Sequence, residues 1–508
     1  MSYILGQDIF NFFTMKKIAY TIVFILLSFG LFSQQGFKKV HSDFPEEGDY
    51  LDMLIDNDTL VFYGLAFDSL HRQGIRFYKA DTLGNIIHTS IIVDTTVVLT
   101  SSWYREEIIK TLDNNYAIIG ATVEGQVYFL KVNRNFELLS LVKYETDIFV
   151  YNASLVEVEE GFFILSFKTQ PNNTLAMNVE LIRTDIDGQE IWRKEYGEQG
   201  YSEVPTGIKK IDDFNFLIYG TYSPYPDWDD PSWPQSTWGS DYFLSIDSSG
   251  NELWNWHSDS TELAAFVGDV ILMPDSSLVY ISGTWETFAG AYTSQPMIVR
   301  RDKDMNLMWQ RKIGYLGGDQ FLTDLEMTPD SNFIASGFAR LVDYPAYSKG
   351  VHFKFSADGD SIWIREDSIT LNDELKIIST EILPSGSIFS IGYYQAPFGQ
   401  FGGVILKITP DGCVDTLNCF PLAVLENAEY QKGMVYPNPA SNTVYFKWSE
   451  GFESGRIELV DLLGRICFQK KINQQQEVDI SHLPKGIYVY RILDTQGTPV
   501  AVGKLVKD

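Results

Sequence analysis

The chain of 508 residues is poor in the residue types that build most metal and nucleophilic sites. It holds 3 cysteines and 6 histidines, and the histidines stand singly along the sequence. The Gly-x-Ser-x-Gly elbow, the His-Glu-x-x-His pair, the P-loop and a Gly-x-Gly-x-x-Gly after a strand are all missing. These absences exclude the common hydrolase, zinc-protease and nucleotide-binding signatures. They favour a non-catalytic protein without a metal or other cofactor.

Basic residues are also scarce, with 39 Lys and Arg against 67 Asp and Glu, which gives a formal net charge of −28. Nearly all of this charge falls on residues 34–420. An acidic body repels phosphate backbones and anionic membrane surfaces, so nucleic acid is not expected as a partner. The simplest use of such a surface is to keep an exported protein soluble.

Long apolar runs are limited to one, at the amino end. Residues 18–32 are apolar, follow two lysines and precede Ser33. A basic start, an apolar core and a small residue at the boundary are typical of a secretory signal peptide. The run is short for a membrane-spanning helix, so a non-cleaved anchor is the weaker alternative. We expect residues 1–33 to be removed, with Met15 as an alternative start, leaving no integral membrane segment.

The three cysteines differ in their surroundings. Cys413 and Cys419 bracket a short loop, whereas Cys467 lies on a strand-like segment near the carboxyl end. A zinc site would need further Cys or His ligands at suitable spacing, and none is nearby. In an exported protein a disulfide between Cys413 and Cys419 is therefore favoured. Cys467 is expected to be a small buried hydrophobic residue.

The body of the chain contains a repeat. A strand-like run ending in Gly, such as residues 61–64, recurs and is followed by a second apolar strand and a tight turn. The second residues of the turns are Gly84, Asn135, Gly188, Gly250, Asn306, Gly359 and Gly412. Their spacing of 51 to 62 residues divides the body into seven units. Short strands repeated at this period predict a seven-bladed β-propeller over residues 34–420.

Radial packing accounts for the repeated residue types. Gly allows close approach of backbones, and Asp-Gly turns suit tight hairpins. Four tryptophans recur just after the turn in consecutive units, and we expect them to pack between neighbouring blades. They are Trp192, Trp254, Trp309 and Trp363. The strand-like residues 36–40 are expected to complete the last unit and so close the ring.

The repeat resembles the delta-60-type or quinoprotein-like propeller repeats of secreted bacterial proteins. The resemblance spans most of residues 45–420 and implies a fold more than a function. Quinone-cofactor catalysis would require a set of charged and metal-binding residues that cannot be assigned in this sequence. His352 lies in a repeated strand, where a structural role is favoured over catalysis.

The last 75 residues, 434–508, carry different motifs. Apolar and polar residues alternate in 457–461 and 487–492, which predicts a small β-sandwich after a linker at 421–433. The segment resembles the type A C-terminal sorting domain of the type IX (Por) secretion system of Bacteroidota. The resemblance is carried by Pro437, Asn438, Pro439, Gly464, Arg465, Gly486, Tyr488 and Lys504. It implies the type IX translocon as a partner, and release or attachment at the cell surface.

One insertion, residues 222–238, lies in the longest interval of the repeat and is rich in Pro, Asp and aromatic residues. Its candidate ligand-contacting residues are Tyr225, Trp228, Trp233 and Trp238. Aromatic faces stack on sugar rings and anchor protein interfaces. A well-packed hairpin and a Ca²⁺ loop are the alternatives, although the Asp spacing does not match an EF-hand. A second aromatic and Gly-rich loop, 393–403, occupies the corresponding place in the last unit.

The sequence thus predicts an exported all-β protein, a seven-bladed propeller followed by a small β-sandwich. The leading functional hypothesis is a non-catalytic module that binds a glycan or a protein, for example in adhesion. A secreted hydrolase or oxidoreductase with its site in the propeller channel is the alternative, since the many acidic residues leave room for a carboxylate pair. A purely structural surface protein is the third.

Overall fold

The structure is a computed structural model. It describes residues 36–41, 50–100, 108–145, 154–170, 173–224, 239–258, 267–288, 291–313, 318–341, 348–369, 374–395, 401–414, 434–436, 440–447, 455–460, 466–472, 476–493 and 499–507. Every helix or strand assigned within these ranges is a β-strand, which confirms the predicted all-β class. No helix in this described part has the length and apolarity needed to cross a membrane. The chain divides into two compact units, Met1–Val424 and Leu425–Asp508.

The described strands of the first unit form six sheets, and most of the strands in a sheet follow one another in sequence. The first sheet comprises β2 (Tyr50–Asp56), β3 (Thr59–Phe67), β4 (Gln73–Asp81) and β5 (Ile86–Ile92). The second comprises β6 (Leu99–Thr100), β7 (Ile108–Lys110), β8 (Tyr116–Thr122), β9 (Val127–Val132) and β10 (Leu138–Tyr144). The third comprises β11 (Ser154–Val158), β12 (Gly161–Gln170), β13 (Asn173–Thr184) and β14 (Glu190–Tyr196). The paired strands of these three sheets run antiparallel.

The fourth sheet comprises β15 (Tyr201–Lys210), β16 (Asn215–Pro224), β17 (Ser240–Asp247) and β18 (Glu252–His257). The fifth comprises β19 (Val270–Leu272), β20 (Leu278–Phe288), β21 (Ala291–Arg301) and β22 (Leu307–Lys312). The eight-stranded sheet comprises β23 (Gly318–Met327), β24 (Phe333–Leu341), β25 (Ser348–Phe355), β26 (Ser361–Asp367), β27 (Glu374–Ile382), β28 (Ile388–Gln395), β29 (Phe401–Ile408) and β1 (Phe37–His41). Its two halves are joined through one parallel pair, Ser348 with Glu374.

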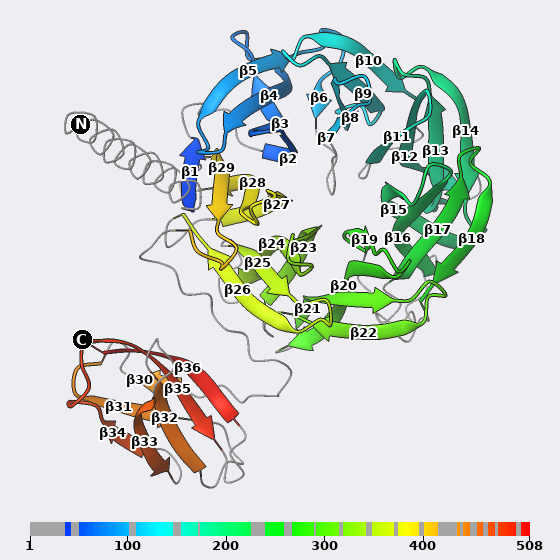
Figure 1. Cartoon of the computed structure of the whole chain (residues 1–508). Coiled ribbons are helices and arrows are strands. Elements are labelled where there is room, and N and C mark those ends of the chain that lie inside the picture. Colours follow the sequence, from blue (N-terminus) through cyan, green and yellow to red (C-terminus); the bar gives the residue numbers. More distant parts are fainter. Residues whose placement is uncertain are drawn as a thin grey trace, which may run out of the picture. The chain divides into compact units, whose positions relative to one another are not determined.

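Divided at that pair, the described strands form seven successive antiparallel sets. Figure 1 shows the sets following one another around a common centre, with the first strand of each set innermost. This arrangement of small sheets around an axis is a β-propeller. Each set can therefore bury its apolar faces only against its neighbours.

The start of the chain completes the last set. β1 pairs antiparallel with β29, with Phe37 opposite Lys407 and Val40 opposite Val404 (Figure 1). This pairing confirms the predicted closure by residues 36–40. Gly36 permits it, because a Cβ at Gly36 would lie 2.5 Å from the carbonyl oxygen of Cys413.

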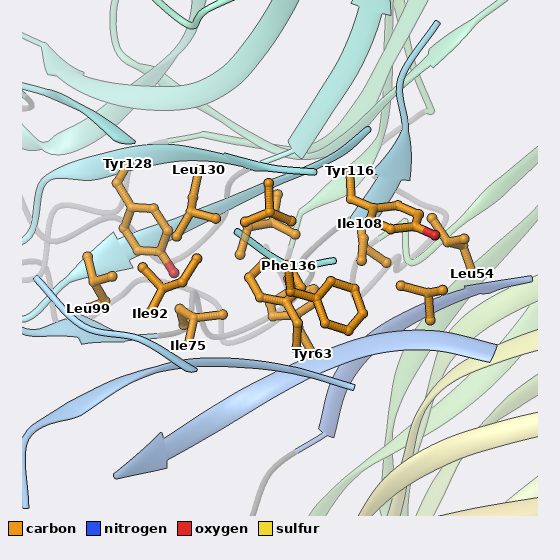
Figure 2. Close-up of a cluster of buried hydrophobic side chains, with 14 residues drawn as sticks. Leu54, Tyr63, Ile75, Ile92, Leu99, Ile108, Tyr116, Tyr128, Leu130 and Phe136 are labelled. Carbon is orange, nitrogen blue, oxygen red and sulfur yellow. The ribbon is translucent and has the colours of Figure 1, made fainter. Parts of the chain in front are cut away.

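The hydrophobic core lies between adjacent sets. Figure 2 shows the first such cluster, in which Tyr63 and Ile75 of the first set meet Tyr116, Leu130 and other residues of the second. Strands β2 to β9 all supply side chains to this cluster, each with less than a tenth of its surface exposed. Burial of each large apolar side chain contributes about 1.5–3 kcal/mol. The ring is thus held together mainly by contacts between neighbours.

The repeated tryptophans contribute to these contacts. A Cβ at Gly250 would touch the ring of Trp192, and Gly359 and Gly412 face Trp309 and Trp363 in the same way. These three Trp side chains therefore pack against the turn of the following set, which agrees with the predicted packing between neighbouring units. Trp254 departs from this pattern and is 39% exposed. The turn that follows it has Met305 at positive φ, where the second turn has Phe136 and the others have Gly. The Met305 side chain is buried near Trp256.

The second unit consists of two sheets. One contains β30 (Met434–Tyr436), β31 (Thr443–Lys447) and β34 (Gln476–Asp479); the other contains β32 (Gly455–Val460), β33 (Ile466–Ile472), β35 (Gly486–Leu493) and β36 (Pro499–Lys507). Side chains of both sheets share one core, in which the Phe446 and Tyr490 rings are 5.2 Å apart. The predicted β-sandwich is therefore confirmed.

One prediction for this sandwich is wrong. Cys467 is exposed, not buried. It lies on β33, the edge strand of its sheet, and the adjacent Phe468 packs against the core. Because successive side chains of a strand point to opposite faces, Phe468 turns Cys467 outward.

Candidate functional site

Most of the residues predicted to act at a site lie outside the described residues. These are the four ligand candidates Tyr225, Trp228, Trp233 and Trp238, the sorting residues Pro437, Asn438, Pro439, Gly464 and Arg465, and Cys419. Cys413 is disulfide-bonded, and its predicted pairing with Cys419 stays a prediction. Of the remaining sorting residues, Gly486 begins β35 and Lys504 lies on β36. Tyr488 is buried and donates its hydroxyl to the Pro484 carbonyl oxygen at 2.9 Å.

The sheet of the fourth set carries a stack of three rings near the end of β16. The Tyr222 ring lies 4.9 Å from that of Tyr201, tilted by 15°, and 4.2 Å from that of His257, tilted by 7°. The three residues come from β16, β15 and β18 of the fourth set. β15 and β16 are adjacent, so Tyr201 and Tyr222 meet on one face of the sheet, whereas β17 lies between β16 and β18. The stack therefore forms where β16 ends and the segment 225–238 begins.

Two carboxylates adjoin this stack. Glu198 is exposed, and its Oε2 accepts the Tyr222 hydroxyl at 3.3 Å. Glu203 pairs directly across the strands with Tyr222 and is only 2% exposed. Its Oε1 accepts the backbone N–H of Glu198 at 2.9 Å, whereas Oε2 has no partner among the described residues. We refer to Tyr201, Tyr222, His257, Glu198 and Glu203 together as the Tyr222 cluster.

Burial changes the chemistry of Glu203. The loss of solvent raises the pKa of its carboxyl group to about 7, and the nearby Glu198 charge acts in the same direction. The hydrogen bond from the Glu198 N–H lowers the pKa but only partly offsets the burial. Glu203 therefore keeps its proton at a higher pH than an ordinary glutamate does. Sequence reasoning missed this residue, because its environment depends on cross-strand neighbours.

The third set holds the Tyr222 cluster in place. Gln170 of β12 donates to the carbonyl oxygens of Glu198 and Tyr201, at 3.0 and 2.8 Å. Gly197 fits closely here, since a Cβ would lie 2.4 Å from the Asn178 side-chain oxygen and 2.9 Å from Glu203 Oε2. The backbone that carries Glu198 and Tyr201 is thus fixed by contacts between sets. The cluster is a preformed arrangement of rings and carboxylates.

A second group of carboxylates lies on the innermost strands. Burial raises the pKa of Asp52 on β2 to about 7, and the Asp324 charge adds to this. The pKa of Glu326 and of Glu381 is also raised, first by burial and then by the Asp324 charge. Asp324 and Glu326 share one side of β23 because side chains alternate along a strand. The centre of the ring is therefore strongly acidic.

The hydrogen bonds of this central group indicate a structural role. Asp52 accepts the N–H of Ile108 at 2.7 Å, and Asp324 accepts that of Thr380 at 2.6 Å. Both bonds join an inner strand to the inner strand of the next set. Within the described residues, no group of three or more Asp, Glu, His or Cys side chains is arranged to hold a metal ion.

His352 and Ser390 are paired as in a catalytic His-Ser pair, but both side chains are closed off from solvent and therefore from a substrate. Its Nε2 lies 2.8 Å from Ser390 Oγ, and Ser390 also bonds Thr380 at 2.9 Å. His352 and Ser390 have no exposed surface. Burial lowers the pKa of His352 to about 4, so the ring is neutral at neutral pH. A nucleophile must reach its substrate, and this network therefore serves the packing of the sixth and seventh sets, as expected for His352.

Comparison with known families decides the role of the second unit. Residues 434–508 match the family described as secretion system C-terminal sorting domain. This segment is a sorting domain. The protein is therefore exported, to the cell surface or the medium, and the sorting domain implies handling by the type IX secretion system. The match covers the carboxyl-terminal unit alone and assigns no task to the propeller.

Several solved structures resemble the chain at low identity. The extracellular domains of BT4673 and BT3049, a predicted one-component and a predicted hybrid two-component system of B. thetaiotaomicron, are each 11% identical, with TM-scores of 0.41 and 0.44. The alignments cover 94% and 93% of this chain but only 59% and 57% of those proteins. A Synechocystis apocarotenoid oxygenase is 9% identical over 74% of this chain and 95% of its own, with a TM-score of 0.39. No curated protein matches the chain.

Proposed function

We propose that the exported propeller is a non-catalytic binding or adhesion module for a glycan or a protein, with residues 225–238 as its contact segment. The observation that carries this proposal is the Tyr222 cluster, which stands where β16 leads into that segment. We further propose that the seven sets of strands are seven blades and that the domains have the bounds predicted from the sequence. The sorting domain would be of type A, and the propeller repeats would be similar to the delta-60 or quinoprotein-like repeats.

The chemistry of this region suits recognition. The segment 225–238 contains Trp228, Trp233 and Trp238, and the strand β16 that leads into it carries Tyr222 of the ring stack. Aromatic faces bind the C–H faces of sugars and form rigid anchors at protein interfaces. Glu198 and His257 are exposed beside these rings and supply polar contacts. The rings of Tyr201 and Tyr222 and the polar groups beside them would thus offer a ligand both aromatic area and hydrogen bonds.

A triple variant, Trp228→Ala, Trp233→Ala and Trp238→Ala, tests the proposal. We expect it to abolish retention on glycan arrays and on target cells while the melting temperature changes little. Trp254→Ala is the matched control, since Trp254 is exposed on the outer strand β18 of the same set. Unchanged binding of the triple variant to cells, glycans and candidate proteins would refute the contact segment.

The alternative is a secreted hydrolase or oxidoreductase that uses the central carboxylates. The raised pKa of Glu326 and Glu381 favours this second candidate, because a protonated carboxyl group is a general acid. Turnover of a glycoside or redox substrate by the purified protein, abolished by Glu381→Gln but not by Glu137→Gln, would establish it. Glu137 is an exposed carboxylate of the second set.

A further inference from the structure

One end of the propeller exposes large apolar side chains among carboxylates. Leu112 is 87% exposed, Phe214 68% and Ile186 51%. A single exposed apolar side chain needs no explanation, whereas several gathered on one surface mark a site of interaction. We call this surface the 112–214 face, and it consists of four segments of the second, third and fourth sets: residues 111–114, 157–160, 185–188 and 211–214.

Hydrogen bonds between sets hold the first three segments side by side. The Leu112 N–H donates to Glu157 Oε2 at 2.7 Å. Lys131 donates to Asp113 Oδ2 at 2.7 Å and to the carbonyl oxygen of Ile186 at 2.9 Å. One buried lysine thus links the first turn of the second set to the last turn of the third set.

The fourth segment joins the face through the innermost strands. The Ile208 N–H of β15 donates to Ser154 Oγ of β11 at 3.2 Å, so the two strands are neighbours (Figure 1). Residues 211–214 follow β15 as residues 159–160 follow β11. Because successive hairpins of an antiparallel sheet lie at alternate ends, β16 carries the chain away from this face. The segment 225–238 therefore begins at the opposite end of the fourth set.

The 112–214 face is acidic on its outside. Its four segments contain eight carboxylates and no lysine or arginine. The Lys131 side chain is only 4% exposed, whereas its partner Asp113 is 46% exposed, so the positive charge lies beneath the negative one. Two further cations from neighbouring strands bond to the face. They are Lys210, which pairs with Asp213 at 2.8 Å, and Arg183, which donates to the Glu159 carbonyl oxygen.

We infer that the 112–214 face docks a partner protein whose surface combines lysine or arginine side chains with apolar ones. Opposite charges steer the partner to the face, and burial of Leu112, Ile186 and Phe214 holds it there. A second copy of this chain would bring like charges together, and nucleic acid and anionic membranes are repelled for the same reason. The inference goes beyond the proposed function, because the face lies at the other end of the propeller from the contact segment.

A designed peptide tests the chemistry of the partner. The probe is an amphipathic helix of about 18 residues built from Lys and Leu. Two control peptides keep its pattern, one with Glu in place of Lys and the other with Ser in place of Leu. In calorimetry with the purified full chain, we expect the Lys/Leu peptide to bind at least about tenfold more tightly than either control. Equally tight binding of either control would overturn the inference.

Variants of the face locate the binding. Leu112→Ser combined with Phe214→Ser should weaken binding of the Lys/Leu peptide at least about tenfold. Glu159→Gln combined with Glu160→Gln should weaken it about threefold and make it less dependent on salt. Full binding by the Leu112 and Phe214 double variant would refute the face as the docking site.

The matched control lies at the opposite end of the second set. Val123 and Glu124 are exposed in the hairpin between β8 and β9, so Val123→Ser combined with Glu124→Gln removes an apolar and an acidic side chain away from the face. This variant should bind the peptide as the wild type does. An equal loss of binding here would show general attraction to an acidic protein and would overturn the inference.

Two further measurements separate the outcomes. A melting curve of each variant distinguishes a lost site from unfolding, which is not expected because the substituted side chains are exposed. Self-association of the wild type in sedimentation, abolished in the Leu112 and Phe214 double variant, would assign the face to a second copy and overturn the basic partner. The Trp triple variant should bind the peptide normally, so failure of the contact segment and failure of this face are distinguishable.

Discussion

The side-chain nitrogen of Lys407 on β29 lies 3.4 Å from the carbonyl oxygen of Thr82, which precedes it by 325 residues. The same kind of hydrogen bond joins other neighbouring sets, because a Lys or Arg side chain on the third strand of one set donates to a backbone carbonyl oxygen in a turn of the next set. Its members are Lys79 to Arg134 at 3.1 Å, Lys131 to Ile186 at 2.9 Å, Arg300 to Ala357 at 3.1 Å and Lys354 to Pro410 at 3.4 Å. The last and first sets are therefore joined in the same way as sets adjacent in sequence.

Ring closure also depends on β1. Phe37 occupies the place of the repeated Trp, because it pairs with Lys407 as Trp363 pairs with Lys354. A Cβ at Gly84 would lie 2.6 Å from its ring. Lys39 bonds the Asn85 side chain at 2.5 Å, so β1 contacts the first set as well as the seventh.

We therefore expect deletion of residues 34–42 to lower the stability of the propeller. The deletion leaves the edge of β29 unpaired and removes the Phe37 contacts, and Phe37→Ala alone should cost roughly 1–3 kcal/mol for a half-buried ring. Thermal unfolding followed by near-ultraviolet circular dichroism measures the effect. Deletion of residues 34 and 35 alone is the control. An unchanged melting temperature of the longer deletion would show that β1 does not close the ring.

Glu203 makes the stability of the propeller depend on pH. Its folded-state pKa of about 7 is above the model-compound value of 4.5, so the folded protein binds more protons than the unfolded chain between these two values. The stability contribution is therefore greatest at low pH and is lost as pH rises through that window. Asp52 acts in the same direction, since burial raises its pKa to about 7.

Glu203→Gln should accordingly stabilise the protein at about pH 8, by roughly 1–3 kcal/mol, and should make little difference at about pH 5. Denaturant titrations at both pH values measure the two differences. Glu195→Gln is the control, because Glu195 is an exposed carboxylate of the preceding strand β14. A destabilisation by Glu203→Gln that is equal at both pH values would contradict the raised pKa.

The sequence was sufficient to predict features that repeat. Gly recurs in most units and Trp in four of them, and this regularity indicated both the strand sets and the packing of Trp309 and Trp363 between neighbouring sets. Contacts without a repeat were harder to find. That Phe37 replaces a Trp became visible only when β1 was placed beside β29, and the state of Glu203 depends on burial that no sequence pattern reports. The orientation of Cys467 was mistaken because Phe468, not Cys467, faces the core.

His352 should matter for stability and not for ligand binding. His352→Ala removes a fully buried ring together with its bond to Ser390, which should cost about 2–4 kcal/mol. Ser390→Ala removes only a hydroxyl group and should cost about 1 kcal/mol. Denaturant unfolding measures both, and glycan binding of each folded variant should equal that of the wild type. Loss of binding in a folded His352→Ala protein would place this network in a ligand site after all.

Export should depend on the folded core of the second unit. Tyr488 is 5% exposed within the core that both sheets of the sandwich share, so Tyr488→Ala should cost about 3–4 kcal/mol in a small domain with little stability to spare. Because the translocon is expected to recognise the folded sorting domain, this variant should remain in the periplasm, as should a chain lacking residues 434–508. Cys467→Ser is the matched control, since Cys467 is exposed on the same sheet and its replacement leaves the core intact. Cell fractionation followed by immunoblotting measures the distribution. Normal export of the Tyr488→Ala chain with an unfolded tail would show that the machinery reads a linear motif instead of a folded sandwich.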